Sequence, residues 1–111
     1  MKSKEYLCKV NEIETIYENK LMKENKNHLL LTESYMQIKK ELEERKAALI
    51  LSKDSYYPDR KEEYKGIKLA LEREIKYSRE NLKILKLTYK CKCNELLMEK
   101  KRAIRKLEIA R

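Results

Sequence analysis

The sequence predicts an all-α fold in which two long helices form an antiparallel coiled-coil hairpin. The 111 residues include one glycine and one proline, and 42% of them are charged. That composition is typical of long helices. Apolar side chains recur at alternating spacings of three and four residues on both sides of residues 54–58, as they do along a coiled-coil seam. The single proline, Pro58, lies where the two patterns meet.

The first pattern predicts a helix over residues 3–53. Its seam positions keep one heptad phase throughout, and most of them are aliphatic or tyrosine, as a buried seam requires. The positions are Leu7, Val10, Glu14, Tyr17, Leu21, Glu24, His28, Leu31, Tyr35, Ile38, Leu42, Arg45 and Leu49.

A turn is expected over residues 54–58. Pro58 lacks a backbone N–H and disfavours helix at the residue before it, so the first helix must end ahead of it. Asp59 and Glu62 suit the positive end of a new helix. The second helix is therefore predicted to span residues 59–110.

The second helix carries a seam of the same kind, although it weakens towards both ends. Near the C-terminus the apolar line moves to Cys93, Leu97, Ile104 and Leu107. The heptad positions are Tyr64, Lys68, Leu71, Ile75, Ser78, Leu82, Leu85, Tyr89, Lys92, Leu96, Glu99, Ala103 and Lys106.

The two seams match when the chain reverses between Tyr56 and Tyr57. Leu49 then faces Tyr64, and His28 faces Leu85, so that the whole chain, residues 1–111, forms one coiled-coil unit. The alternative is one long helix, kinked at Pro58, that pairs in parallel with a second copy.

Each helix also carries apolar side chains outside its seam at heptad spacing. A two-helix hairpin has a single seam and leaves such stripes exposed, which favours packing against further helices of a second copy or of another coiled-coil subunit. The alternative is a surface with scattered exposed apolar residues. The candidate partner-helix residues are Met22, Leu29, Met36, Ile50, Tyr77, Ile84 and Met98.

Positive charge is concentrated in the second half of the chain. Residues 1–57 carry 11 basic and 10 acidic side chains, whereas residues 58–111 carry 17 and 9. A basic band on one helix can bind nucleic-acid phosphates or an acidic polymer such as microtubules, or it can be a solvated face. The candidate patch consists of Arg79, Lys83, Lys86, Lys90, Lys100, Lys101, Arg102 and Arg105.

The residues around the turn are a third candidate surface. Tyr57, Pro58 and Arg60 could present themselves to a partner at the tip of a hairpin. The alternative is that the tyrosines of this segment cap the last layers of the core.

Sites of chemistry are not apparent in the sequence. His28 is the only histidine, and no cysteine, aspartate or second histidine stands one helical turn away from it. Cys91 and Cys93 lie about 200° apart on a helix, so they cannot bind one metal ion together. One glycine cannot build a phosphate-binding loop. The sequence therefore predicts no enzyme, metal, cofactor or small-molecule substrate.

The expected location is intracellular, either cytoplasmic or nuclear. No apolar run approaches the length of a membrane span, and the first residues lack the apolar core of a secretory signal. The expected function is that of a structural interaction protein, a scaffold or spacer that assembles with other helices. The alternative function is a basic accessory protein that binds nucleic acid or an acidic polymer through the second helix.

Overall fold

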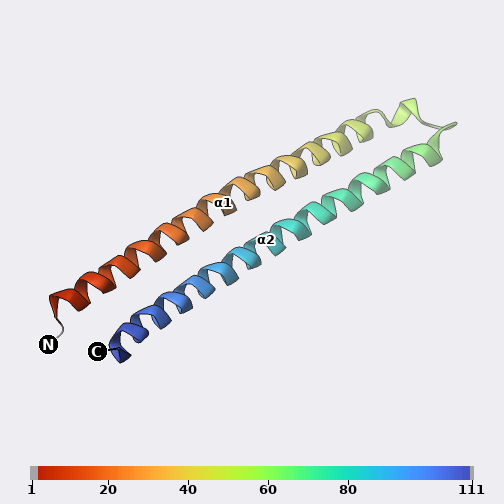
Figure 1. Ribbon diagram of the computed structural model, residues 1–111. Coiled ribbons are helices and arrows are strands. Elements are labelled where there is room, and N and C mark those ends of the chain that lie inside the picture. The colour runs from red at the N-terminus through yellow and green to blue at the C-terminus, as the bar shows by residue number, and fades with distance from the viewer. Residues whose placement is uncertain (1–2, 111) are drawn as a thin grey trace. The chain divides into compact units, whose positions relative to one another are not determined.

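Two long helices make up almost all of the computed structural model, which describes residues 3–110 (Figure 1). Helix α1 spans Lys4–Leu51, the short 3-10 helix η1 spans Lys53–Ser55, and helix α2 spans Lys61–Ile109. The long helices pack against each other, and the described residues form no strand. The predicted all-α hairpin is confirmed, in preference to a kinked helix in a parallel dimer.

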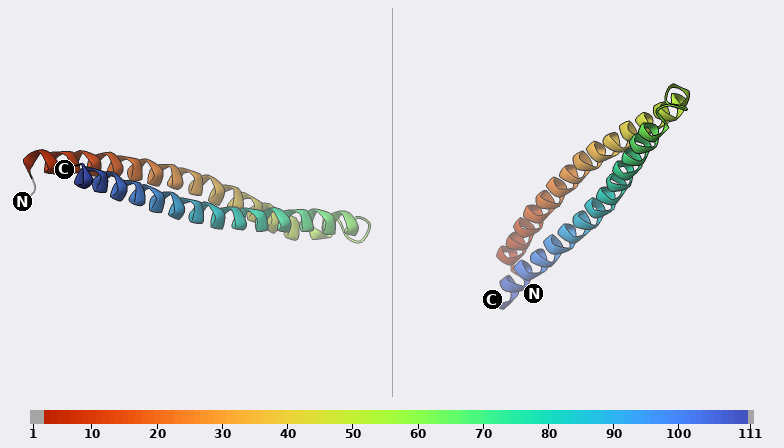
Figure 2. Two further views of the ribbon diagram at one scale, coloured as in Figure 1. Left: turned by 60° about the horizontal axis from the view of Figure 1, so that its bottom comes forward. Right: turned by 90° about the vertical axis from the view of Figure 1, so that its right-hand side faces the viewer.

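The contacts between the helices divide the chain into two compact units. Among the described residues, the terminal unit consists of residues 3–29 and 86–110, and the turn unit consists of residues 30–85. Within each unit, a stretch of α1 lies beside a stretch of α2 that runs in the opposite direction (Figure 2).

The link between the helices is longer than the predicted turn. Helix α1 ends at Leu51, where the hydroxyl of Ser52 donates a hydrogen bond of 2.9 Å to the carbonyl oxygen of Leu49. This bond satisfies one of the carbonyls that every helix leaves open at its C-terminus. Helix α2 begins at Lys61 with Glu62 and Glu63 in its first turn. There the carboxylates favour the positive end of the helix dipole.

The core of the turn unit occupies positions that the heptad pattern predicts. Leu42, Leu49, Tyr64, Ile75 and Ser78 are all buried. Each comes from the seam listed for its helix, and burial of the apolar members stabilises the fold by roughly 25 cal/mol for each Å² removed from water.

The alternate seam positions of α1 differ from the prediction in this unit. Leu31 and Ile38 are 49% and 47% exposed, and Arg45 is also exposed. The half-buried positions are each one residue later, at Thr32, Lys39 and Lys46. The seam has therefore moved relative to the heptad.

A stutter explains the shift. The partly buried positions Glu24, His28 and Thr32 follow one another at two successive steps of four residues. A strict heptad drifts by about 20° per repeat on a straight α-helix, and a stutter compensates for that drift. Helix α2 has the same feature at Leu85, Tyr89 and Cys93.

Beyond its stutter, α2 buries different residues from those the heptad predicts. Cys93, Lys100 and Leu107 are half-buried in place of Lys92, Glu99 and Lys106. The apolar line expected near the C-terminus is right for Cys93, Ile104 and Leu107 and wrong for Leu97, which is exposed. The continued 3-4 spacing from Cys93 onwards selects these positions.

Tyr6 takes the seam position that was expected for Leu7. Tyr6 is only 5% exposed, whereas Leu7 is 49% exposed. The hydroxyl of Tyr6 donates a hydrogen bond of 2.9 Å to Oε1 of Glu108 on α2. A tyrosine can bury its ring while its hydroxyl forms a hydrogen bond, which suits it to the solvent-exposed end of a helix pair.

The shifted seam predicts unequal costs for two substitutions of the same type. Leu42→Ala should lower the free energy of unfolding by about 2–4 kcal/mol because it leaves a cavity in the core. Leu31→Ala should cost less than about 1 kcal/mol because its side chain is half exposed. Urea unfolding at low protein concentration, followed by circular dichroism, measures both. Equal costs would favour the uninterrupted heptad.

Candidate interaction surfaces

A polar layer crosses the seam of the terminal unit beside the stutter. The rings of His28 and Tyr89 are stacked, with centroids 4.2 Å apart and planes inclined by 14°. The hydroxyl of Tyr89 donates a hydrogen bond of 3.1 Å to Oδ1 of Asn25. In the same unit, Lys92 and Glu24 form an ion pair at 3.9 Å. The sequence placed Leu85 opposite His28, but the ring that meets His28 lies one helical turn further along α2.

Only some of the polar atoms in this layer have hydrogen-bond partners. The pKa of Tyr89 is raised, first by hydrogen bonding to the Cys93 thiol and then by burial. The Nδ1 atom of His28 is buried and has no hydrogen-bond partner among the described residues. An unpaired buried nitrogen costs stability, so the layer is retained at an energetic expense. In coiled coils, polar seam residues of this kind fix the register.

Replacement of His28 tests whether its unpaired Nδ1 atom destabilises the hairpin. His28→Phe should raise the free energy of unfolding by about 1 kcal/mol, because it keeps the ring stack and removes the unpaired nitrogen. His28→Ala should lower it, because the stack is lost. Thermal melts of the three chains provide the measurement. A lower melting temperature for His28→Phe would show that Nδ1 has a partner.

The candidate contacts at the turn belong to an aromatic cluster. Tyr64 is buried, and the rings of Tyr56 and Tyr57 lie 5.8 and 5.6 Å from its ring. Pro58 is exposed and follows a cis peptide bond. These contacts support the alternative in which the tyrosines cap the core.

Arg60 is occupied by neighbours within the turn unit. Its guanidinium lies 4.9 Å from the centre of the Tyr56 ring and donates two hydrogen bonds, of 2.8 and 2.7 Å, to the carboxylate of Glu63. This pairing raises the pKa of Arg60 and lowers the pKa of Glu63. A partner at the tip would have to displace these contacts.

The lowered pKa of Glu63 has a measurable consequence. Its stabilising contribution is present above the ordinary carboxyl pKa and is lost as pH falls through the lowered value. The contribution is small because the pair is solvated. A carboxyl chemical-shift titration should give Glu63 a midpoint below the ordinary carboxyl value, and Arg60→Ala should move that midpoint upward. An unchanged midpoint would contradict the pairing.

The predicted partner-helix residues all lie on the surface. Met22 is 70% exposed, and the other six are between 45% and 62% exposed. In the terminal unit they are Met22, Leu29 and Met98, and in the turn unit they are Met36, Ile50, Tyr77 and Ile84. Leu31 and Ile38, which the sequence assigned to the core, add to the exposed apolar surface of the turn unit.

The members of the candidate basic patch differ in their surroundings. In the turn unit, Arg79 lies 3.7 Å from Glu43, so its charge is partly compensated. In the terminal unit, Lys100 is half-buried at a seam position. The remaining members are exposed, and among residues 3–110 none of them forms an ion pair: Lys83, Lys86, Lys90, Lys101, Arg102 and Arg105.

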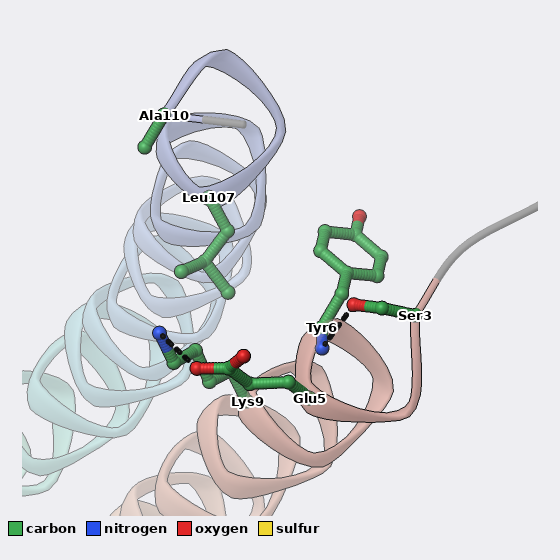
Figure 3. A pocket seen from close by; sticks show the side chains of 6 residues that line it. All are labelled: Ser3, Glu5, Tyr6, Lys9, Leu107 and Ala110. Atoms are coloured by element: carbon green, nitrogen blue, oxygen red, sulfur yellow. Dashed lines mark hydrogen bonds and ion pairs between the residues drawn. The ribbon is translucent and has the colours of Figure 1, made fainter.

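A shallow depression lies near the start of α1 and the end of α2 in the terminal unit (Figure 3). Leu107 and Ala110 of α2 and Tyr6 of α1 line it. The polar side chains of Ser3, Glu5 and Lys9 in this depression already form hydrogen bonds or ion pairs within α1 and its N-cap. The hydroxyl of Ser3 accepts a hydrogen bond of 3.1 Å from the Tyr6 N–H as an N-cap, and the side chain of Lys9 pairs with that of Glu5 (Figure 3). Among the described residues that line the depression, no converging set of ligand-binding groups remains.

The described residues contain no cluster of three metal-ligating side chains. Cys8 and Cys91 are exposed, Cys93 is half-buried, and all three are free thiols. Neither helix, over the part that the structure describes, has a stretch long and apolar enough to cross a membrane.

No protein-family model, curated protein or solved structure matches this chain.

Proposed function

We propose that the chain is a non-enzymatic structural interaction protein, whose helical hairpin packs against other helices as a scaffold or spacer subunit. The observation that supports this proposal is the exposure of apolar side chains outside the seam. Met22 and Leu29, one heptad apart on α1, are exposed, and so are Tyr77 and Ile84, one heptad apart on α2.

The heptad spacing of these residues distinguishes them from apolar side chains that are exposed at scattered positions. Side chains seven residues apart lie on nearly the same line along a helix, so each pair can contact one partner helix. Large exposed apolar patches mark sites of protein interaction. Coiled-coil hairpins acquire further layers in this way and form bundles of three or four helices.

Binding of a defined helical probe tests the proposal. The probe is an amphipathic peptide with Leu at heptad positions a and d and uncharged polar residues elsewhere. Sedimentation velocity of the chain, alone and with the probe, should reveal self-association or complex formation, because either would bury the stripes. The variant Met22→Gln, Leu29→Gln, Ile84→Gln should associate at least about tenfold more weakly, a loss of roughly 1.4 kcal/mol.

The same variant should keep its helical circular dichroism, because all three side chains are exposed. As a matched control, Asn19→Gln with Glu33→Gln alters exposed polar residues of α1 and should leave association unchanged. A chain that stays monomeric and binds no helical probe would contradict the proposal.

A second candidate function is supported by the six exposed members of the basic patch that form no ion pair among residues 3–110: Lys83, Lys86, Lys90, Lys101, Arg102 and Arg105. Such side chains can bind the phosphates of nucleic acid or the acidic surface of a polymer such as a microtubule. Binding of this kind weakens steeply as salt rises, whereas helix packing through apolar stripes does not.

A further inference from the structure

We propose that the outward face of α2 in the terminal unit docks an acidic amphipathic helix from a partner protein. The inference rests on the proposed function and specifies the chemistry of the partner.

The face is defined by a stripe of α2 that points away from α1. Its members up to Arg105 each lie two residues before a partly buried position, as Leu87 precedes Tyr89 and Cys91 precedes Cys93, and Ile109 continues the line one heptad after Arg102. Two residues correspond to about 200° on a helix, so the stripe is opposite the seam. The members of this outer stripe are all exposed: Leu87, Cys91, Asn94, Met98, Arg102, Arg105 and Ile109.

The outer stripe has the spacing of a docking seam. Its steps of four and three residues match those by which α1 and α2 pack together. Leu87 and Met98 are 62% and 50% exposed, and Ile109 is 78% exposed. Burial of these side chains contributes free energy only if another apolar surface covers them.

The charges around the stripe select an acidic occupant. Residues 86–110 carry eight basic and three acidic side chains, whereas residues 4–29 of α1 carry five of each. Arg102 and Arg105 lie within the stripe, Lys101 borders it, and Glu95 is the acidic residue at its edge. A second copy of α2 would bring the same positive charges into contact, which is repulsive.

Nucleic acid fits this face less well than an acidic helix does. Leu87 and Met98 contribute nothing to a phosphate contact and would stay in water. Stacking of bases requires aromatic side chains. Tyr89, the tyrosine of α2 in this unit, lies in the seam against His28.

Three helical probes test the proposal on the full chain. All share Leu at heptad positions a and d, and they carry Glu, Lys or uncharged polar residues at positions e and g. The Glu probe should bind at least about tenfold more tightly than the uncharged probe at low salt, and the Lys probe should bind most weakly. The advantage of the Glu probe should shrink as salt rises.

Charge reversal locates the site. The variant Lys101→Glu, Arg102→Glu, Arg105→Glu should invert the order of the Glu and Lys probes. The matched control Lys4→Glu, Lys23→Glu, Lys26→Glu changes the net charge equally on exposed positions of α1 and should preserve the order. Leu87→Gln with Met98→Gln should weaken binding of all three probes without loss of helicity.

Thiol labelling gives an independent readout. Cys91 lies within the outer stripe, and Cys8 is exposed on α1. The bound Glu probe should slow the reaction of Cys91 with a maleimide several-fold and leave that of Cys8 unchanged. Equal protection of both thiols would overturn the assignment to α2.

The remaining outcomes separate this inference from the proposed function. Equal binding of the Glu and uncharged probes would overturn the acidic partner and leave helix packing intact. A chain that binds no helical probe and does not self-associate would overturn both. Binding of duplex DNA but of no helical probe, lost in the α2 charge-reversal variant, would establish the nucleic-acid alternative instead.

Discussion

Helices α1 and α2 are held together along a single apolar seam, and this seam limits what the fold can bury. Two helices share only one line of contact, so each can bury only the side chains that follow that line. In the turn unit Leu42, Leu49, Tyr64 and Ile75 fill it. Apolar side chains that lie off that line, such as Met22 and Tyr77, stay exposed, because a hairpin has no second layer. The candidate interaction surfaces are thus a direct consequence of how little a two-helix fold can bury.

The stutter makes this consequence stronger. It lets the seam follow helices that a strict heptad would require to supercoil. Its cost in the turn unit is that Leu31 and Ile38 are moved out, while Thr32 and Lys39 take the inner positions. Beside it, the stack of His28 on Tyr89 occupies a seam position with polar groups. The seam is therefore less apolar than an uninterrupted heptad would make it, and the surface is more apolar.

The two helices differ in charge as well as in position. In the turn unit, ion pairs join them across the seam: Lys46 to Glu72 at 3.3 Å and Arg79 to Glu43 at 3.7 Å. In the terminal unit most of the excess positive charge of α2 has no such counterpart on α1. Exposed pairs contribute little to stability. The unpaired charge is thus better placed to select a partner than to hold the hairpin together.

The two helices, the reversal near Pro58 and most of the core positions follow from the amino-acid sequence, because helical periodicity and the stop at proline are local properties of the chain. The candidate stripes and the basic bias of α2 also follow from the sequence, since both are patterns along one helix. The exposure of Leu31, Ile38 and Leu97 and the contact between Tyr89 and His28 depend instead on how the two helices pack. A heptad read on one helix assumes an unbroken phase, and the stutter becomes visible only when the burial of facing side chains is known. The same holds for Arg60, whose partners Tyr56 and Glu63 depend on how the turn folds.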